Sequence, residues 1–282
     1  MSKIYDVIVL GAGPAGLAAG LYAGRSRLSV LIIEKGQDGG QISITDEIEN
    51  YPGQVVDQPE SGPSLIARMT EQAKKFGAER VSDTIKEVTL EGDVKVLKGE
   101  KGEYQAKNII IATGAHARPI GCKGEAEFLG RGVSYCAVCD GPFFKEKTAA
   151  VVGGGSAALQ DALYLAGICS KVYLIHRRDT FRAEKSLIDQ VMTAENIECV
   201  MESRVTALIG EKKLTELEVT NLAGEKKTLV ADGLFVAIGM EPHNEVFRDL
   251  VDLDEAGYVI AGENCKTRTP GVYAAGDCRT KT

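Results

Sequence analysis

The fold is decided by the stretch YDVIVLGAGPAG at residues 5–16. Residues 5–10 are a short run rich in aliphatic and β-branched side chains, which predicts a buried parallel strand. The glycine-rich residues that follow predict a tight turn and then a helix that continues to about Arg25. A second apolar run at residues 28–33 predicts another strand, and Glu34 stands at its end. Together these segments form one βαβ unit.

The three glycines of this turn occupy the positions of a G-x-G-x-x-G dinucleotide-binding motif. Gly11 allows the tight turn, Gly13 lets the backbone approach a pyrophosphate, and Gly16 lets the helix pack close to the strand. Glu34 would accept hydrogen bonds from the hydroxyl groups of a ribose. The alternative is a glycine-rich turn that binds no ligand, but the strand before the motif and the acid after it favour a dinucleotide site.

The same pattern recurs 142 residues further along the chain. Residues 148–152 and 171–175 predict strands, and between them GGGSAA at 153–158 predicts the turn that opens a helix. Alanine replaces the third glycine, which the motif allows. The chain therefore contains an internal duplication with two dinucleotide-binding units.

The two units differ in charge at the end of their second strands. Where the first unit has Glu34, the second has His176, Arg177 and Arg178, with Arg182 one turn further on. Arginine binds a ribose 2′-phosphate that a carboxylate would repel. We therefore expect a ribose with free hydroxyl groups in the first unit and NADP(H) rather than NAD in the second. A solvated basic stretch is the alternative for the arginines.

The composition limits the class of protein. The chain has 282 residues, about two domains, and its formal net charge of −7 argues against a general nucleic-acid binder. Hydrophobic residues make up 44% and charged residues 26%, which excludes wholesale disorder. The seven cysteines are an odd and small number, so we expect a reducing, cytoplasmic setting rather than a disulfide scaffold.

Residues 7–24 contain no charged residue, which raises the alternative of a membrane span or a signal peptide. Five glycines and Pro14 lie within the stretch, and no basic segment precedes it. A buried strand, a turn and a helix with a small-residue face explain this composition better, so we expect no membrane association.

Three further strand-like segments end in glycine or in glycine and aspartate, at residues 108–114, 234–239 and 272–277. Each predicts a parallel strand whose carboxyl end meets a ligand. The segments 87–96 and 217–230 alternate in polarity around turn residues, which predicts antiparallel hairpins on the parallel sheets. The fold class is therefore α/β.

A CxxC motif lies shortly before the second turn, with Cys136 and Cys139 followed by Asp140. Such a pair is half of a zinc site, a redox disulfide or two inert thiols. Zinc would need two more ligands, and the chain has no second CxxC and only three histidines. A dithiol/disulfide is favoured, and Asp140 is placed to handle the proton of thiol exchange. A turn or cap role is the alternative for Asp140.

The two dinucleotide units and the CxxC together resemble the low-molecular-weight, bacterial-type thioredoxin reductases, class II pyridine nucleotide-disulfide oxidoreductases. The resemblance covers nearly the whole chain and is carried by GAGPAG at 11–16, GGQ at 39–41, ENYPG at 49–53, ATGA at 112–115, GRGVSYCAVCDG at 130–141, GGGSAA at 153–158, HRRDTFRA at 176–183 and GVYAAGD at 271–277. It implies two Rossmann-like FAD/NAD(P)-binding domains, with the NADPH domain inserted in the FAD domain. The FAD domain would comprise residues 1–115 and 243–282, and the NADPH domain residues 116–242.

The resemblance also implies the cofactors and their sites. FAD would bind at Gly11, Gly13, Pro14, Gly16, Glu34, Lys35, Gly40, Gln41, Asn50, Thr113, Gly114, Gly276 and Asp277. NADPH would bind at Gly153, Gly155, Ser156, Ala158, His176, Arg177, Arg178, Arg182, Ile238 and Gly239. No metal is expected.

The implied reaction passes a hydride from NADPH to FAD, opens the Cys136–Cys139 disulfide and then reduces oxidised thioredoxin. Cys139 would be the thiol nearer the flavin, Asp140 the acid/base, and Cys136 the nucleophile toward thioredoxin. The NADPH domain would rotate between these steps. Phe143 and Phe144 would help to dock thioredoxin, with core packing as the alternative. The resemblance further implies a cytoplasmic homodimer.

This chain departs from the family pattern in the second turn. One acidic position is Gln160, another is the shorter Asp161, and Ser156 begins a different polar pair. Two alternatives therefore stay open: a ferredoxin-dependent or peroxiredoxin-system flavin disulfide reductase of the same fold, and a non-enzymatic flavin redox sensor. The retained arginines favour NADPH. The family also continues past the position of Thr282 with a further helix. Either this sequence is truncated or disordered at that point, which we favour, or flavin binding is unusual.

Overall fold

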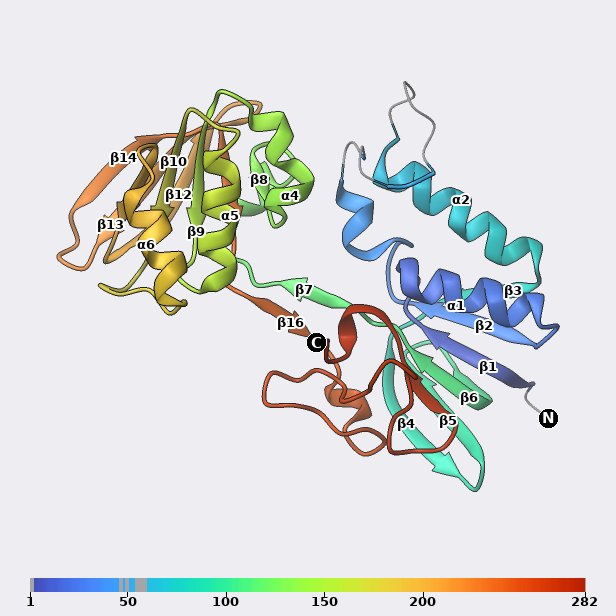
Figure 1. Cartoon of the computed structure of the whole chain (residues 1–282). Coiled ribbons are helices and arrows are strands. Elements are labelled where there is room, and N and C mark those ends of the chain that lie inside the picture. Colours follow the sequence, from blue (N-terminus) through green and yellow to red (C-terminus); the bar gives the residue numbers. More distant parts are fainter. Residues whose placement is uncertain (1–2, 46–47, 49–50, 54–59, 282) are drawn as a thin grey trace. The chain divides into compact units, whose positions relative to one another are not determined.

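The computed structural model describes residues 3–45, 48, 51–53 and 60–281 of the chain. The chain divides into two compact units (Figure 1). Unit 1 consists of Met1–His116 and Glu241–Thr282, and unit 2 consists of Ala117–Met240. In the sequence, unit 2 is thus an insertion between the two parts of unit 1.

Unit 1 is built on a sheet with the strand order β3-β2-β1-β6-β5-β4, in which β17 also pairs with β6. The strands are β1 (Ile4–Leu10), β2 (Val30–Glu34), β3 (Ala78–Ser82), β4 (Ile85–Glu91), β5 (Val94–Gly99), β6 (Glu103–Ile111) and β17 (Val272–Ala274). The pairs β1–β2, β2–β3, β1–β6 and β6–β17 are parallel, whereas β4–β5 and β5–β6 are antiparallel. Both the predicted parallel core and the predicted first hairpin are therefore present.

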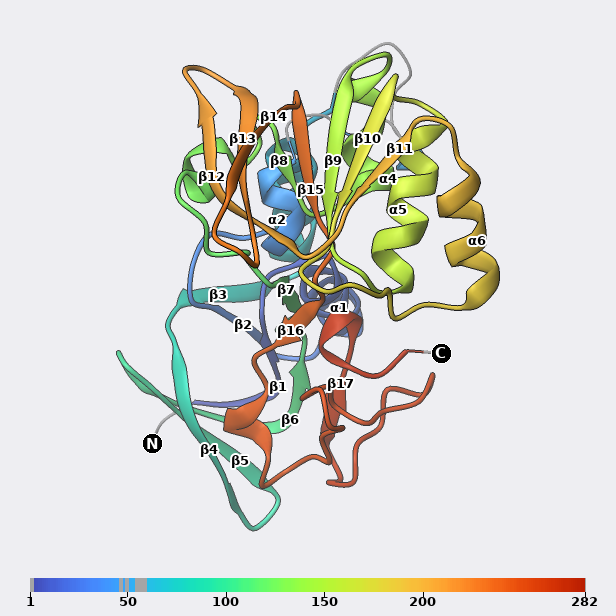
Figure 2. The same cartoon turned by 90° about the vertical axis from the view of Figure 1, so that its left-hand side faces the viewer.

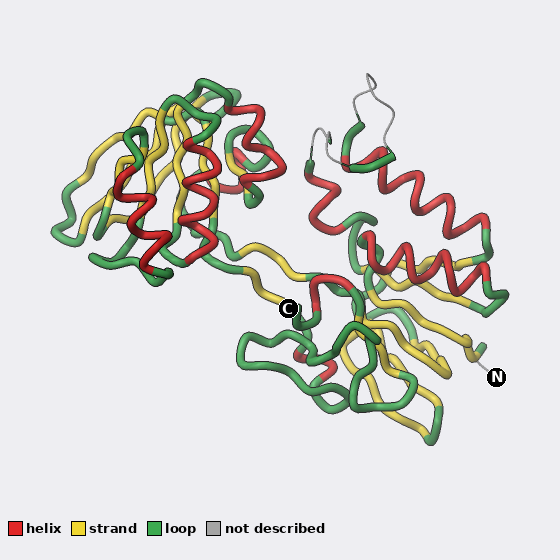
Figure 3. Tube along the Cα trace, viewed as in Figure 1, coloured by secondary structure: helices red, strands yellow, loops and turns green. Residues whose placement is uncertain are grey.

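The two faces of this sheet are covered differently. Helices α1 (Pro14–Arg25) and α2 (Gly62–Lys75) pack on the face to which Val9 belongs. Ile8, the preceding residue, belongs to the opposite face, where Phe247 and the C-terminal segment complete a second core. Because successive residues of a strand point to opposite faces, one aliphatic run supplies both cores. The tube drawing shows the two helices beside the sheet (Figure 3).

Unit 2 repeats this plan around the strand order β11-β10-β9-β15-β8, with a separate sheet β12-β13-β14. Its strands are β8 (Val133–Ser134), β9 (Thr148–Val152), β10 (Lys171–Ile175), β11 (Ile197–Val200), β12 (Ser203–Gly210), β13 (Leu214–Asn221), β14 (Lys226–Val230) and β15 (Gly233–Val236). Helices α5 (Ser156–Ala166) and α6 (Lys185–Thr193) cover the face of Val151. The antiparallel sheet covers the face of Ala150 (Figure 2).

Short elements complete the chain. They are η1 (Gly40–Ile44), β7 (Ala115–Ala117), α3 (Glu125–Phe128), α4 (Ala137–Asp140), η2 (Gly141–Phe144), β16 (Met240–Pro242), η3 (Glu245–Phe247) and η4 (Gly276–Cys278). Strands β7 and β16, which lie where the chain passes between the units, pair with each other. Among the described residues, no helix combines the length and the apolar character needed to cross a membrane.

Four predicted strands begin or end at other residues than expected, and the reason is local at one end of each. The strand expected at 28–33 begins at Val30, because Arg27 has a φ of 61° and the chain turns there. The strands expected to run to 114, 239 and 277 end at residues 111, 236 and 274. Gly114, Gly239 and Gly276 that follow them all have positive φ, a conformation that ends a strand.

Candidate functional site

The first glycine turn is shaped by close backbone contacts at two of its three glycines. A Cβ atom on Gly16 would lie 1.9 Å from the carbonyl oxygen of Gly11, and one on Gly11 would lie 2.3 Å from that of Ala112. A Cβ on Gly13 would have no atom within 4 Å. Gly11 and Gly16 are thus required by the fold, whereas Gly13 borders open space at the start of α1, where the motif places a pyrophosphate.

The N-terminus of α1 is the centre of this site. Gly13 is its N-cap residue and provides no side chain to accept hydrogen bonds from the first turn, and Pro14 follows at the first helical position. Gly40 lies beside Gly13, with 3.8 Å between its Cβ position and the Gly13 Cα, and Gly276 packs against the Cβ of Ala15. Backbone from three distant segments therefore surrounds a helix N-terminus that is suited to bind an anion.

Glu34 lies at the end of β2 and faces the same turn. Its Oε2 accepts a hydrogen bond from the backbone N–H of Ala12 at 2.8 Å, and its Oε1 accepts one from Gly36 at 2.9 Å. These two bonds orient the carboxylate and leave further lone pairs for ribose hydroxyl groups. The side chain lines a cavity of about 190 Å³ in unit 1.

This cavity includes residues that the sequence analysis did not identify. Its lining consists of Leu10, Gly11, Ile33, Glu34, Lys35, Asp83, Thr84, Ile85, Thr113, His116, His243, Val246 and Phe247. The rings of His116 and His243 lie 5.4 Å apart, and burial, followed by the nearby Lys35 charge, lowers the pKa of His116. His116 could have been predicted from its position after the strand expected at 108–114. Phe247 and His243 reach this cavity only through tertiary packing.

The remaining predicted residues of the first site are held by polar contacts. The amide nitrogen of Gln41 donates to the carbonyl oxygen of Ala115. Thr113 donates to the buried side chain of Asn244, which itself donates to the carbonyl oxygens of Gly257 and Cys278. Asn244 was not predicted and joins the end of β6 to the C-terminal segment. The predicted contact Asn50 lies outside the described residues.

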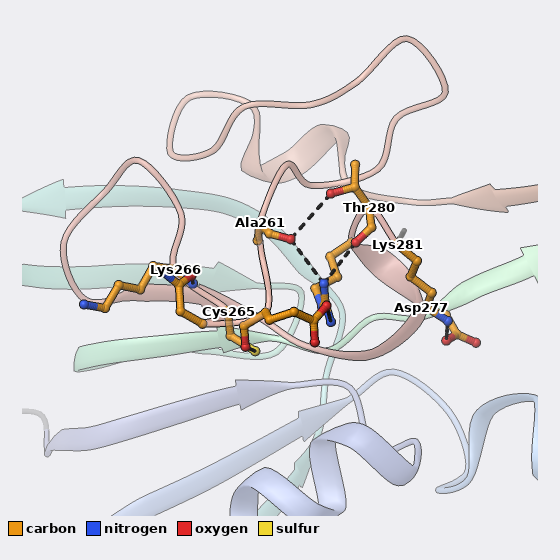
Figure 4. A network of polar contacts seen from close by, with 9 residues as sticks. Ala261, Cys265, Lys266, Asp277, Thr280 and Lys281 are labelled. Carbon is orange, nitrogen blue, oxygen red and sulfur yellow. Dashed lines mark hydrogen bonds and ion pairs between the residues drawn. The ribbon is translucent and has the colours of Figure 1, made fainter.

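Asp277 follows Gly276 in the short helix η4 and forms an ion pair with Lys281 (Figure 4). In the same view, the hydroxyl of Thr280 lies against the carbonyl oxygen of Ala261, to which Arg279 also donates. These contacts fix the segment that carries Gly276 and Asp277 beside the first turn of α1.

The second glycine turn has the same construction in unit 2. A Cβ on Gly153 would lie 2.4 Å from the carbonyl oxygen of Ala237 and 2.5 Å from the Cβ of Ala158. Gly155 is the N-cap of α5, and no side chain caps the helix. Ser156 begins α5, and Gly239, after Ile238, has no atom within 4 Å of its Cβ position. The start of α5 is therefore also a candidate anion site.

His176 is placed beneath this turn rather than on the surface. Its ring atoms lie 2.1–2.5 Å from the Cβ position of Gly154, and it stacks on Phe181 with ring centroids 5.6 Å apart. One ring nitrogen lies 3.1 Å from the carbonyl oxygen of Thr180. Burial lowers the pKa of His176, followed by the charges of the neighbouring arginines. Its position indicates that it supports the turn and explains why Gly154 has no side chain.

The three arginines lie around the turn. Arg177 and Arg182 are exposed and Arg178 is half-buried. The backbone N–H of Arg182 donates to the carbonyl oxygen of Gly154 at 2.7 Å, which holds the arginine beside the glycines. Among the ion pairs of the described residues, none joins these guanidinium groups to a carboxylate. Their charges are therefore available for a phosphate.

Two residues of the second turn that depart from the family pattern lie on α5. Gln160 is exposed and Asp161 is half-buried, and burial raises the pKa of the Asp161 carboxyl. Both residues lie on α5 beyond the glycines of the turn, and the glycines and the arginines are present beside them.

Cys136 and Cys139 form a disulfide in unit 2, with their Cα atoms 5.3 Å apart. Cys136 is the N-cap of α4: its Sγ accepts from the backbone N–H of Cys139 at 3.2 Å, and its carbonyl oxygen accepts from that of Asp140 at 3.1 Å. In the described part of the chain, no group of three or more His, Cys, Asp or Glu side chains is arranged to hold a metal ion. The five other cysteines are free.

The two phenylalanines after the CxxC have different environments. Phe144 packs edge-on against Phe235 with ring centroids 5.3 Å apart, and it fills the space beside Gly233. Phe143 is 38% exposed. Val138, between the two cysteines, is 56% exposed, and the ring of Tyr164, which contacts Gly141, is 38% exposed. The structure thus packs the half-buried Phe144 against the core of unit 2 and leaves Phe143 exposed a few residues after the disulfide.

Comparisons with known proteins match the whole chain. The family model for pyridine nucleotide-disulphide oxidoreductases matches residues 5–282. The chain is 46% identical over 289 residues to the thioredoxin reductase of Peptoclostridium acidaminophilum, covering 100% of this chain and 91% of that protein. It is 44% identical to the thioredoxin reductase of Bacillus subtilis, covering 99% and 88%. The crystal structure of thioredoxin reductase from Streptococcus pyogenes superposes with a TM-score of 0.92 at 40% identity, covering 100% and 92%.

Proposed function

Because the chain belongs to the pyridine nucleotide-disulphide oxidoreductase family, and within it to the low-molecular-weight thioredoxin reductases, we propose that unit 1 binds FAD and unit 2 binds NADPH. Family membership by itself implies a flavin, a nicotinamide cofactor and an oxidoreductase that acts on thioredoxin. The assignment of each cofactor to a unit rests on the residues at the two strand ends.

Unit 1 has the features that FAD requires. Gly13 and Gly40 border open space at the uncapped start of α1, where a pyrophosphate is bound by backbone N–H groups. Glu34 is oriented toward the turn and suits a ribose with both hydroxyl groups free. Lys35 and Thr113 line the adjoining cavity, and Gly114, Gly276 and Asp277 lie at strand ends that approach the same edge.

Unit 2 has the features that NADPH requires. The turn at Gly153 and Gly155 opens α5 without a side-chain cap. Arg182 lies beside it, and Arg177 and Arg178 follow His176, whose ring lies under Gly154. In the described chain none of the three arginines has a carboxylate partner. Arg177, Arg178 and Arg182 would bind the 2′-phosphate that distinguishes NADPH from NADH. This contrast between a carboxylate in one unit and unpaired arginines in the other is the observation that carries the proposal.

The disulfide is the group through which electrons leave the protein. When bound, FAD and NADPH would supply the chemistry of hydride and electron-pair transfer. With that electron pair and two protons, the Cys136–Cys139 disulfide would become two thiols. Asp140, directly after Cys139, is proposed to provide and accept the proton. Burial raises the pKa of Cys122 and of Cys169 to about 11, so these free thiols stay protonated and do not compete.

Transfer to thioredoxin is a dithiol–disulfide exchange. The Cys136 thiolate attacks one sulfur of the thioredoxin disulfide, which forms a mixed disulfide and releases one thioredoxin thiolate to take up a proton. The Cys139 thiolate then attacks the Cys136 sulfur, re-forms the Cys136–Cys139 disulfide and releases the second thiol of thioredoxin. Phe143, with Val138 and Tyr164 around the disulfide, is proposed to contact thioredoxin. Resemblance to the family further supports a homodimer in the cytoplasm.

The arginines provide the most specific test of this proposal. The double variant Arg177→Ala/Arg178→Ala should raise the KM for NADPH at least about tenfold and leave the KM for NADH nearly unchanged, since each lost charge-assisted hydrogen bond costs about 1.5–3 kcal/mol. Arg204→Ala, an exposed arginine on β12, is the matched control. Equal losses for both nucleotides would contradict the 2′-phosphate assignment, and turnover with thioredoxin by the wild type distinguishes the enzyme from a redox sensor.

A further inference from the structure

A buried carboxylate lies close to the redox disulfide and takes no part in the reaction described above. Glu125, in the short helix α3, is only 6% exposed. Its Oε1 accepts hydrogen bonds from the backbone N–H of Ile120 at 2.9 Å and from the hydroxyl of Tyr135 at 3.1 Å. Its Oε2 accepts one from the backbone N–H of Gly121 at 2.7 Å. Glu125 therefore joins the segment just after β7 to the residue that immediately precedes Cys136.

The two residues before Cys136, Ser134 and Tyr135, both make hydrogen bonds that hold the segment leading to it. Ser134, in β8, accepts a hydrogen bond from the backbone N–H of Cys136 at 3.0 Å and donates to its carbonyl oxygen at 3.3 Å. Ser134 is buried, and β8 pairs with the central strand β15. Tyr135 lies between this strand and the cysteine, so the Glu125–Tyr135 bond is a further attachment of the CxxC segment to unit 2, on the other side of Cys136 in the sequence from the buried Ala137.

These attachments matter most after the disulfide has been reduced. In the disulfide form, the bond between the two sulfur atoms itself fixes Cys136 relative to Cys139. In the dithiol form that constraint is gone, and the position of the Cys136 sulfur depends on the packing of Ala137 and on the hydrogen bonds of its own segment. Burial, followed by the Glu125 charge, raises the pKa of Tyr135 to about 12, so the tyrosine hydroxyl remains a hydrogen-bond donor throughout the working pH range.

We propose that Glu125 is a positioning residue for thiol–disulfide exchange: it anchors Tyr135 and thereby holds Cys136 in place for attack on a partner disulfide. The proposal rests on the role of Cys136 given above. It predicts that loss of the anchor slows the steps of the dithiol enzyme and leaves the reduction of the flavin by NADPH unchanged, because no residue of the anchor belongs to either nucleotide site.

Three variants of the holoenzyme test this proposal. Tyr135→Phe removes only the hydroxyl bond, Glu125→Gln places an amide among backbone donors, and Glu127→Gln changes an exposed carboxylate on the same short helix as the control. We expect Tyr135→Phe to lower kcat for thioredoxin about tenfold with KM changed by less than about twofold, since misplacement of a reacting group acts on the chemical step. Stopped-flow reduction of the flavin by NADPH should match the wild type.

Alkylation of the reduced protein by iodoacetamide, with the modified peptide identified by mass spectrometry, gives a readout that a merely structural role would not change. The rate at Cys136, followed against pH, should change in Tyr135→Phe and Glu125→Gln and not in Glu127→Gln. Wild-type kcat and wild-type alkylation in Tyr135→Phe would overturn the proposal, as would equal losses in Glu127→Gln. If the wild type fails to reduce thioredoxin, the proposed function is wrong, and the alkylation profiles alone decide the role of Glu125. Tyr135→Phe carries the test if Glu125→Gln does not fold.

Discussion

Gly13 and Gly16 belong to one turn but are required by different partners. At Gly16 the nearest obstacle to a side chain is the backbone of Gly11, only 1.9 Å from the Cβ position. At Gly13 the described chain leaves the space free, and the φ of −72° suits any residue. The requirement for glycine at Gly13 must therefore come from a bound ligand, which is how the motif explains it.

This difference predicts opposite results for two alanine variants. Gly16→Ala should lower the free energy of unfolding of the apoprotein by about 1–3 kcal/mol, because helix α1 must move away from β1. Gly13→Ala should lower the free energy of unfolding of the apoprotein by less than about 1 kcal/mol, the usual effect of alanine at an N-cap. It should weaken FAD binding at least about tenfold, since the methyl group occupies the approach of the pyrophosphate. Thermal unfolding and flavin fluorescence titration measure the two effects. A destabilised Gly13→Ala apoprotein with normal FAD affinity would contradict this account.

The buried His176 predicts a pH dependence of stability. Its pKa in the folded protein is lowered by burial, whereas in the unfolded chain it is near its ordinary value of about 6.5. As the pH drops below about 6.5, the unfolded chain takes up a proton on this histidine that the folded protein does not. The free energy of unfolding therefore falls as the pH drops through this range. His176→Gln should therefore lose less stability than the wild type between about pH 7.5 and about pH 5.5, measured by denaturant unfolding. Equal losses would show that His176 is not the group responsible.

At the scale of elements, the two phenylalanines of the short segment after the CxxC differ in burial, and we propose different roles for them. Phe144 belongs to the core of unit 2 through Phe235, whereas Phe143 is exposed. Phe144→Ala should lower the free energy of unfolding by about 1–3 kcal/mol, because its half-buried ring packs against Phe235. Phe143→Ala should leave stability within about 0.5 kcal/mol and raise the KM for thioredoxin. If Phe143→Ala changed neither quantity, the exposed apolar group would have no role in docking.

The elements around the two glycine turns could be predicted because their strands are buried on both faces and are therefore continuous aliphatic runs. The edge strands β3 and β11 were not predicted, since AERVS and IECV are half-exposed and carry charged residues. Helix α2 was missed although it has a sequence signal: Ser61 and Ser64 form reciprocal capping hydrogen bonds at its start.

The candidate sites were predicted to the extent that they depend on local sequence. The glycines, Glu34, the arginines and the CxxC each stand at a strand end or a helix start, and the structure brings each set to one turn. Asn244, His243 and Phe247 approach the first site from a segment more than a hundred residues away in sequence, so only tertiary packing reveals them. The role of Glu125 likewise depends on a contact that no motif encodes.

At the scale of the whole molecule, one architecture occurs twice. The residues at the end of its second strand carry opposite charge in the two units: Glu34 in unit 1, and Arg177 and Arg178 in unit 2. The confirmed fold class is α/β with two Rossmann-like units, each with helices on one face and antiparallel strands or irregular segments on the other. The chain is acidic overall, with a net charge of −7, so the arginines of unit 2 form a local exception to its average. Duplication thus supplies two candidate nucleotide sites, and we propose that the residues at the strand ends distinguish them.

Anaerobic titration of the FAD-loaded protein with NADPH tests the central claim most directly, because one spectrum reports on both nucleotide sites and on the disulfide. We predict that the flavin absorbance is bleached by NADPH and far less by NADH. Complete reduction should take about two equivalents of NADPH per chain, one electron pair for the flavin and one for the disulfide, and about one equivalent in a Cys136→Ser/Cys139→Ser variant. A flavin that keeps its absorbance in excess NADPH, or a wild type and a variant that consume the same amount, would contradict the account.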